Sequence, residues 1–151
     1  MSTHDVSVSW RRDRPDFTYD TYGRDHRWAF GTGSLVQASA AEAYKGNPDL
    51  VNPEEALVAA LSSCHMLTFL AIAARRRFVV DSYVDDAMGY LEKNAAGRMA
   101  VTRVTLRPAI VFSGERPPSP AEIAHLHEAA HKECFIANSV TTVITVDSPL
   151  A

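Results

Sequence analysis

The size and composition of the chain predict one soluble globular domain spanning residues 1–151. A chain of 151 residues can bury about two thirds of the surface that it would expose when unfolded. Its 46% of hydrophobic and 22% of charged residues lie far from disordered or fibrous compositions. The net charge of -3 argues against a nucleic-acid partner, because nucleic-acid binders usually carry a surplus of basic residues.

The N-terminal residues indicate where the protein works. Residues 1–5 contain neither a basic region nor an apolar stretch of the kind that secretory signals have, so we expect a cytoplasmic location. The chain has 2 cysteines, too few for a disulfide scaffold. In a reducing compartment such a pair is more often catalytic, redox-active or simply buried.

Two stretches near the N-terminus alternate in polarity, which predicts strands. Residues 6–10 alternate apolar residues with serines, the period of a strand with one buried face. Residues 22–30 alternate as well, and as a single strand they would direct Arg24 into an aromatic face, where a guanidinium is costly without a partner. The alternative is that Gly23 marks a turn or bulge and Arg24 is solvated.

A hairpin and a loop lead into the middle of the chain. Gly31-Thr32-Gly33 predicts a hairpin turn that returns into a strand over residues 34–39. Residues 40–51 are predicted to form a loop, and a long loop before a buried helix commonly shapes the mouth of a pocket. The alternative is an inert surface loop.

A long helix is predicted to begin directly after Asn52. Asn52 suits the N-cap position, Pro53 the first helical position, and Glu55 can complete a capping box. Glu54 has no capping task and is left for another role. Residues 56–74 contain no Asp, Glu, Lys or Arg, and their apolar character on every side predicts a helix buried at the centre of a protein or dimer. The polar residues within it argue against a transmembrane span, so no membrane partner is expected.

The second half of the chain predicts a long antiparallel pair, a helix and a closing strand. The pair comprises residues 79–93 and 98–112. Ser119 is a predicted N-cap, and the helix that follows has an inward apolar face that includes Cys134. A closing strand is predicted over residues 140–146.

The chemistry of the chain depends on Cys64 and Cys134, which both lie on apolar helix faces. They are either two unrelated buried thiols or a reactive pair. A reactive thiol must be held as thiolate by a nearby cation such as Arg24. That cation needs a carboxylate such as Glu54 to hold its planar group.

The spacing of Glu54 and Cys64 adds a constraint. They are 10 residues apart on one helix, which separates them by about 15 Å along its axis. Both can serve one site only if two such helices pair antiparallel about a two-fold axis, which predicts a homodimer with sites at its interface.

Two other classes of function remain open. His127 and His131 are one turn apart, Cys134 follows, and His65 adjoins Cys64, so a zinc site is conceivable, but a complete ligand set is not evident. A non-catalytic dimeric module that binds a small molecule in an apolar pocket is the other alternative. A serine hydrolase is not expected, because there is no Gly-x-Ser-x-Gly motif.

Three segments of the chain together resemble a known family. Asn52-Pro53-Glu54-Glu55-Ala56-Leu57 runs into Ala60-Leu61-Ser62-Ser63-Cys64, with Tyr22-Gly23-Arg24-Asp25-His26 upstream and His131-Lys132-Glu133-Cys134 downstream. The pattern resembles the osmotically inducible protein C and organic hydroperoxide resistance family of peroxidases over nearly the whole chain. The resemblance implies an α+β fold in which curved antiparallel sheets wrap around central helices in an intertwined homodimer.

The resemblance also implies a role for each site residue. Cys64 looks like the peroxidatic thiolate and Cys134 like the resolving thiol that forms a disulfide with it. Arg24 looks like the cation that stabilises the thiolate, and Glu54 like the carboxylate partner of that cation. Arg27 competes for the cation's role, and the strand parity favours Arg24.

The implied activity is the reduction of organic hydroperoxides, with hydrogen peroxide as a second candidate substrate. The reductant would be an external dithiol, often a lipoyl group, and no cofactor or metal is expected. The chain departs from the family at Phe135-Ile136-Ala137-Asn138, where the best-studied members have Pro and a small polar residue after the second cysteine. The departure bears on the resolving step and on the range of substrates.

Overall fold

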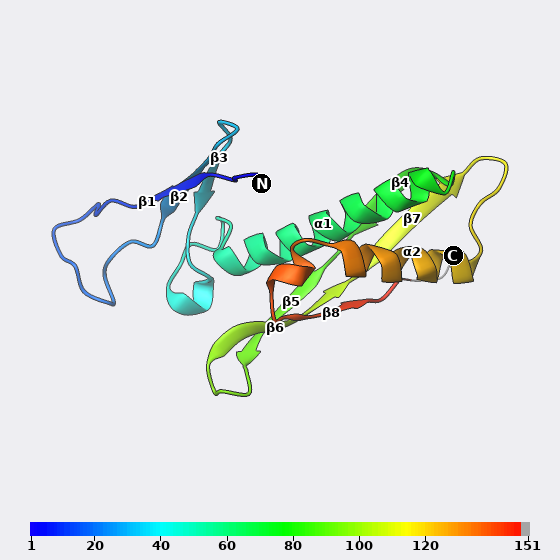
Figure 1. The fold of residues 1–151 in the computed structure, drawn as a ribbon. Coiled ribbons are helices and arrows are strands. Elements are labelled where there is room, and N and C mark those ends of the chain that lie inside the picture. Colours follow the sequence, from blue (N-terminus) through cyan, green and yellow to red (C-terminus); the bar gives the residue numbers. More distant parts are fainter. Residues whose placement is uncertain (149–151) are drawn as a thin grey trace. The chain divides into compact units, whose positions relative to one another are not determined.

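The computed structural model describes residues 1–148 (Figure 1). The last three residues of the domain predicted over 1–151 lie outside the described part. The fold is mixed α+β, as predicted. Contacts within the chain divide it into two compact units, Met1–Ala56 and a second that begins at Leu57. The single domain stays a prediction.

The first unit contains a three-stranded antiparallel sheet. Its strands are β1 (Val6–Ser9), β2 (His26–Phe30) and β3 (Leu35–Ala38), in that order across the sheet. The predicted hairpin turn joins β2 to β3, where the N–H of Gly33 donates to the carbonyl oxygen of Phe30 at 2.8 Å and Gly33 has a φ of 89°. Only glycine adopts that φ readily, so the turn depends on it. A short 3-10 helix, η1 (Glu42–Tyr44), lies in the predicted loop.

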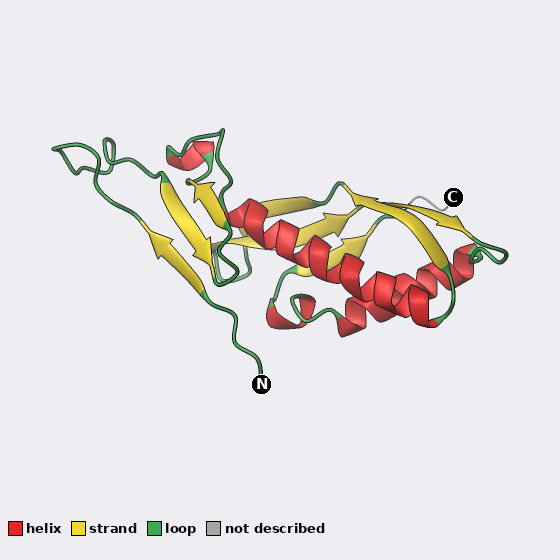
Figure 2. Ribbon diagram, turned by 90° about the horizontal axis from the view of Figure 1, so that it is seen from above, coloured by secondary structure: helices red, strands yellow, loops and turns green. Residues whose placement is uncertain are grey.

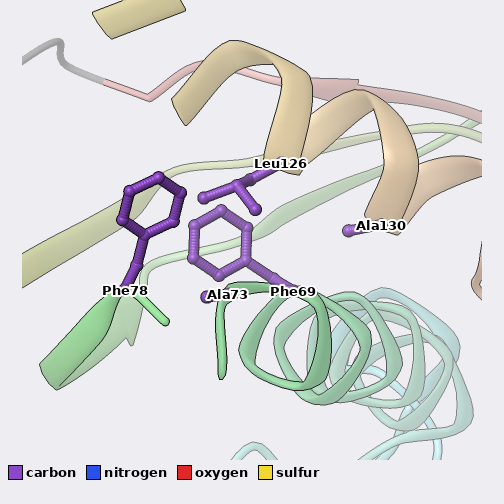
Figure 3. Close-up of a cluster of buried hydrophobic side chains, with 5 residues drawn as sticks. All are labelled: Phe69, Ala73, Phe78, Leu126 and Ala130. Atoms are coloured by element: carbon purple, nitrogen blue, oxygen red, sulfur yellow. The ribbon is translucent and has the colours of Figure 1, made fainter. Parts of the chain in front are cut away.

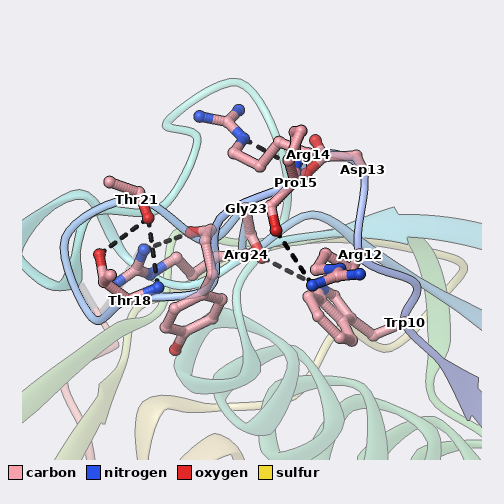
Figure 4. Close-up of polar contacts among 10 residues, drawn as sticks. Trp10, Arg12, Asp13, Arg14, Pro15, Thr18, Thr21, Gly23 and Arg24 are labelled. Atoms are coloured by element: carbon pink, nitrogen blue, oxygen red, sulfur yellow. Dashed lines mark hydrogen bonds and ion pairs between the residues drawn. The ribbon is translucent and has the colours of Figure 1, made fainter.

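Two details of this unit differ from the prediction. The strand at residues 6–9 forms, but Val6 and Val8 are 55% and 62% exposed, because the described residues of this unit place no second layer over them. The strand predicted over residues 22–30 begins only at His26. Before it, side chains take up backbone carbonyls that a strand ladder would use: Trp10 Nε1 donates to Gly23 O at 2.8 Å (Figure 4).

The long helix forms where it was predicted. α1 (Pro53–Arg75) begins after Asn52, whose side-chain oxygen accepts the N–H of Glu55 at 2.9 Å. The carboxylate of Glu55 accepts the N–H of Asn52 in return at 3.1 Å. This reciprocal capping box satisfies two backbone donors at the start of the helix. It confirms the capping role of Glu55.

The second unit contains the predicted antiparallel pair, but divided into two sheets. β4 (Val79–Asp85) pairs with β7 (Pro108–Ser113), and β5 (Met88–Lys93) pairs with β6 (Met99–Leu106). The division falls where the carboxylate of Asp85 accepts the N–H of Arg107 at 2.6 Å. That side-chain bond replaces a ladder bond, and Pro108 has no N–H to restore one.

The last elements complete this unit. α2 (Pro120–Glu133) begins at the predicted capping box, with Ser119 as N-cap and Glu122 as its partner. A second 3-10 helix, η2 (Ala137–Ser139), follows, and β8 (Val143–Val146) adds to β6 in parallel, so that the second sheet has the order β5-β6-β8. In both views α1 and α2 run beside the strands of this unit (Figure 1, Figure 2).

Helix α1 supplies side chains to both core clusters of the second unit. One cluster joins α1 to α2 and comprises Phe69, Ala73, Phe78, Leu126 and Ala130 (Figure 3). The other joins Leu61 to Val104 and Leu106 of β6.

By length and composition alone α1 could cross a membrane, a test that the core helix of a soluble protein also passes. The absence of a membrane partner stays a prediction.

Candidate active site

The two cysteines, 70 positions apart (134 minus 64), are brought together in the second unit. Cys64 lies in the middle of α1, and Cys134 is the C-cap of α2. Their thiol groups share a hydrogen bond, and both cysteines are free. Cys64 is partly exposed, whereas Cys134 is only 1% exposed. Cys64 is therefore partly accessible to solvent, whereas Cys134 is enclosed.

Backbone N–H groups of the turn after α2 surround both sulfur atoms. The N–H groups of Phe135 and Ile136 donate to the sulfur of Cys64. The N–H of Ala137 donates to Sγ of Cys134 at 3.4 Å. These donors are available because Cys134 has an extended ψ of 113° and ends the helix. The turn thus forms a small cradle of donors that favours negative charge on sulfur.

The cradle and the burial of the thiols separate the pKa values of the two cysteines. Burial raises the pKa of Cys64, but the N–H of Ile136, the thiol of Cys134, the N–H of Phe135 and the hydroxyl of Thr68 together outweigh it, so its pKa lies below the usual value. Burial and the hydrogen bond with Cys64 raise the pKa of Cys134. Cys64 is therefore deprotonated to the thiolate more readily, whereas Cys134 tends to remain a protonated thiol.

Arg24 lies in the first unit, half-buried just before β2. Its guanidinium donates to the carbonyl oxygens of Tyr19 and Tyr22 and lies over the ring of Tyr22, 3.8 Å from the centroid. Among residues 1–148, its buried Nε has no hydrogen-bond partner. Arg24 precedes the strand and is half-buried, so the single strand from residue 22 and the solvated arginine are both wrong, whereas the predicted position of Arg24 against aromatic side chains is confirmed.

The competing cation, Arg27, is in a different setting. It lies within β2 and is exposed, opposite Ser9 and Gln37 of the neighbouring strands. Arg24, in contrast, is fixed by carbonyl groups and retains an unused donor. Strand parity no longer supports Arg24, so the choice between the two arginines stays a prediction.

Glu54 lies in the first turn of α1 and is half-buried. Capping is done by Glu55, as predicted, so the Glu54 carboxylate has no capping role. In the described part of the chain it forms no ion pair with Arg24. Arg24 and Glu54 belong to the first unit and the two thiols to the second. The four-residue site stays a prediction.

Sequence reasoning missed a buried pair of histidines beside the thiols. His65 Nε2 lies 3.0 Å from His127 Nδ1, and the two rings stack with centroids 5.4 Å apart. Burial, then His127 and His131, lower the pKa of His65 to about 4. The signal was available, because His65 falls at helical spacing between the buried residues Leu61 and Phe69.

The zinc alternative finds little support in this geometry. Within residues 1–148, no group of three or more His, Cys, Asp or Glu side chains is arranged to hold a metal ion. His65 and His127 bond to one another, and His131 is exposed. The histidines noted in the sequence therefore form a hydrogen-bonded pair and a surface residue.

Comparison with known proteins agrees with this fold. The family model of the OsmC-like protein matches residues 46–148. An OsmC-like protein of unknown function from Vibrio cholerae is 47% identical in sequence, with a TM-score of 0.95, over 99% of this chain and 100% of that one. The chain therefore belongs to the OsmC-like protein family, as the resemblance predicted. A search of the curated proteins finds no match.

More distant solved structures share the fold. An organic hydroperoxide resistance protein from Elizabethkingia anophelis is 18% identical, with a TM-score of 0.73 over 98% of this chain and 94% of that one. The organic hydroperoxide resistance protein OhrB of Bacillus subtilis is 14% identical, with a TM-score of 0.67 over 98% of each chain. At these identities the likeness concerns the fold.

Proposed function

We propose that this protein is a cysteine-based peroxidase that reduces organic hydroperoxides, with hydrogen peroxide as a second candidate substrate. The observation that carries the proposal is the pair of thiols in hydrogen-bonding contact, one partly exposed with a lowered pKa and the other buried with a raised pKa. Membership of the OsmC-like family supports it, as do the names of the structural relatives.

The first step uses the partly exposed thiolate. The sulfur of Cys64 attacks one peroxide oxygen, the O–O bond breaks, and the alkoxide takes a proton and leaves as an alcohol. Cys64 becomes a sulfenic acid, oxidised by two electrons, and the peroxide is reduced by two electrons. The N–H groups of Phe135 and Ile136 stabilise the thiolate before the attack.

The second step uses the buried thiol. Cys134 loses its proton and attacks the sulfur of the Cys64 sulfenic acid, so that an S–S bond forms and the hydroxyl group leaves as water. An external dithiol, of the lipoyl type or another thiol, then reduces the disulfide and becomes oxidised itself. No cofactor takes part. These steps suit the reducing cytoplasm, which we propose as the location.

We also propose that the active form is a homodimer. One face of α1 is exposed in the single chain and is almost wholly apolar; it comprises Ala60, Ser63, Leu67, Ala71 and Ala74. Leu67 is 60% exposed. Small residues at helical spacing suit close packing against a second copy of α1. An antiparallel arrangement would bring Glu54 and Arg24 of one copy to the thiols of the other.

Peroxide consumption by thiol variants tests the chemistry. We expect the reduced wild-type protein to consume cumene hydroperoxide catalytically with a dithiol present, and Cys64→Ser to lose this activity. Cys134→Ser should retain the first step and accumulate a sulfenic acid that dimedone traps. If Cys64→Ser consumes peroxide as fast as the wild type, the proposal is wrong. A binding module would leave both wild-type thiols unreacted, and a zinc protein would retain stoichiometric metal on purification.

The molar mass in solution tests the dimer. We expect Leu67→Glu to shift the protein from dimer to monomer, because a carboxylate would be buried in the apolar contact. Met99→Glu, at an exposed position at the start of β6, serves as the charge-matched control and should remain dimeric. A wild-type protein that is monomeric at micromolar concentration would refute the dimer.

A further inference from the structure

The contact between α1 and α2 contains one polar bond at its centre. His65 and His127 are 1% and 7% exposed, and their 3.0 Å hydrogen bond lies beside the ring of Phe69, whose centroid is 4.6 Å from that of His127. Apolar contacts are non-directional, whereas a hydrogen bond is satisfied only over a narrow range of distance and angle. The bond therefore restricts how the two helices can slide and rotate against each other.

The same two helices carry the two thiols next to this bond. His65 directly follows Cys64 in α1, so their side chains diverge by about 100° around the helix. On α2, His127 lies seven positions (134 minus 127) before Cys134, which places both on nearly the same face about two turns apart. Adjacent residues of α1 thus contact one face of α2 at two places, His65 at His127 and Cys64 at Cys134.

We propose that the hydrogen bond between His65 and His127 fixes α2 against α1 and thereby holds the thiol of Cys134 in position for its attack on Cys64. The inference rests on the proposed function, because it assigns the histidines to the resolving step. They are positioning residues, since neither ring is among the groups that hydrogen-bond to either sulfur. The reaction that they assist is the formation of the S–S bond with loss of water from the sulfenic acid.

The other contacts between the helices do not fix this position by themselves. The α1–α2 cluster joins Phe69 and Ala73 to Leu126 and Ala130, all of them apolar and two of them alanines (Figure 3). Cys134 caps α2, and the N–H groups that reach the sulfur of Cys64 come from the residues directly after it. A small rotation of α2 would therefore move the resolving thiol and the donor cradle together.

The two ring nitrogens that form the bond allow a sharp choice of variants. An asparagine amide occupies nearly the position of a histidine Nδ1, and a glutamine amide nearly that of Nε2. Because His127 uses Nδ1, His127→Asn keeps the bond and His127→Gln does not. Because His65 uses Nε2, His65→Gln keeps the bond and His65→Asn does not. The double change His65→Phe with His127→Phe retains two stacked rings without a polar atom to bury.

The test is the rate at which the Cys64–Cys134 disulfide forms in the full chain, followed by mass spectrometry after rapid alkylation. Diamide drives the reaction through an adduct on Cys64 that Cys134 displaces, with the diazene reduced to a hydrazine. We expect disulfide formation to slow about tenfold or more in His127→Gln and in the double phenylalanine variant. His127→Asn should stay within about twofold of the wild type, because it retains the bond.

The rate of the first step, the formation of the Cys64 sulfenic acid, distinguishes a positioning role in the resolving step from a general structural role of the histidines. Trapping of the Cys64 sulfenic acid by dimedone in a Cys134→Ser background should slow by no more than about threefold in the histidine variants, because a displaced cradle weakens the stabilisation of the thiolate without preventing its attack on the peroxide. The proposal would be overturned if disulfide formation slowed equally in His127→Asn and His127→Gln. It would also be overturned if the double phenylalanine variant formed the disulfide at the wild-type rate. If the wild type does not consume cumene hydroperoxide, the proposed function fails, and the diamide rates still decide whether the histidines position Cys134.

Discussion

Cys64 and Cys134 share a hydrogen bond, yet their pKa values move in opposite directions from that of a free thiol. Burial raises both. In Cys64 the N–H of Ile136, the Cys134 thiol and further donors outweigh burial, whereas in Cys134 the contact with Cys64 adds to it. A negative charge on one sulfur is thus stabilised by the proton that the other keeps. The pair is asymmetric before any peroxide arrives.

This asymmetry predicts the order in which the thiols react with an alkylating agent as the pH rises. Only the thiolate reacts, so each cysteine reacts at half its maximal rate near its own pKa. We expect the midpoint for iodoacetamide to lie below the usual thiol range for Cys64 and above it for Cys134, as measured by peptide mass spectrometry. Cys134→Ala should raise the Cys64 midpoint, because one donor is lost. A Cys134 midpoint below that of Cys64 would contradict the assignment of roles.

A weaker donor to Cys64 provides a graded test. The hydroxyl of Thr68 lies 2.8 Å from the carbonyl oxygen of Cys64 and also reaches its sulfur, where it is the smallest of the contributions that lower the pKa. Its single proton can serve only one acceptor at a time. We therefore expect Thr68→Val to slow alkylation of Cys64 at neutral pH only by about twofold. Thr68→Ser keeps the hydroxyl and should behave as the wild type; equal rates in all three proteins would remove Thr68 from the site.

The parts of this fold that the sequence predicts well are those held by local hydrogen bonds. The capping boxes at Asn52 and Ser119 each join residues three positions apart, so residue types alone identify them. Alternation identifies most strands, but it placed the start of β2 too early. Gly23 and Arg24 follow the alternating pattern, but their conformation is set by hydrogen bonds with Trp10 and Tyr19. Alternation within residues 22–30 cannot predict these contacts.

The parts that could not be predicted depend on residues far apart in the chain. The carboxylate of Asp85 divides the long hairpin by bonding to the N–H of Arg107, and β8 joins β6 in parallel. His65 and His127 meet only because both helices pack in one unit. The pairing of the thiols was implied by family resemblance, whereas the donors from Phe135 and Ile136 are backbone groups that carry no side-chain signal.

The buried histidine pair predicts a loss of stability in acid. The pKa of His65 is lowered to about 4 from 6.5, so the unfolded chain binds this proton at a higher pH than the folded chain does. Its contribution is complete above pH 6.5 and is lost as the pH falls from 6.5 towards 4, by roughly 3 kcal/mol in all. Urea unfolding at about pH 7.5, 5.5 and 4.5 would measure how steeply the free energy of unfolding falls as the pH is lowered.

The matched variant for this measurement is His65→Gln, which keeps a hydrogen-bonding group but does not titrate. We expect its unfolding free energy to fall less steeply between neutral pH and pH 4.5 than that of the wild type. Some slope should remain, because burial also lowers the pKa of His127. If the two proteins lose stability in parallel, His65 is not the group responsible.

The close approach of β5 to α1 predicts that Gly89 cannot be enlarged without cost. A Cβ at this position would lie 2.4 Å from Cγ2 of Val58, a residue of α1 that packs on the second core cluster. We expect Gly89→Ala to destabilise the protein by about 1–3 kcal/mol. Gly31→Ala is the control, since its nearest neighbour, the carbonyl oxygen of Asp5, would be 3.5 Å away in ordinary contact.

A double-mutant cycle assigns the strain to this one pair of residues. Val58→Ala removes the atom that the new Cβ would meet, so Gly89→Ala should cost less in that background than in the wild type. Thermal unfolding of the four proteins gives the coupling between the two positions. Because Val58 lies six positions before Cys64 on the same helix, the Gly89→Ala protein should also show altered Cys64 alkylation if the strain shifts α1. An equal loss of stability in both backgrounds would mean that the strain lies elsewhere.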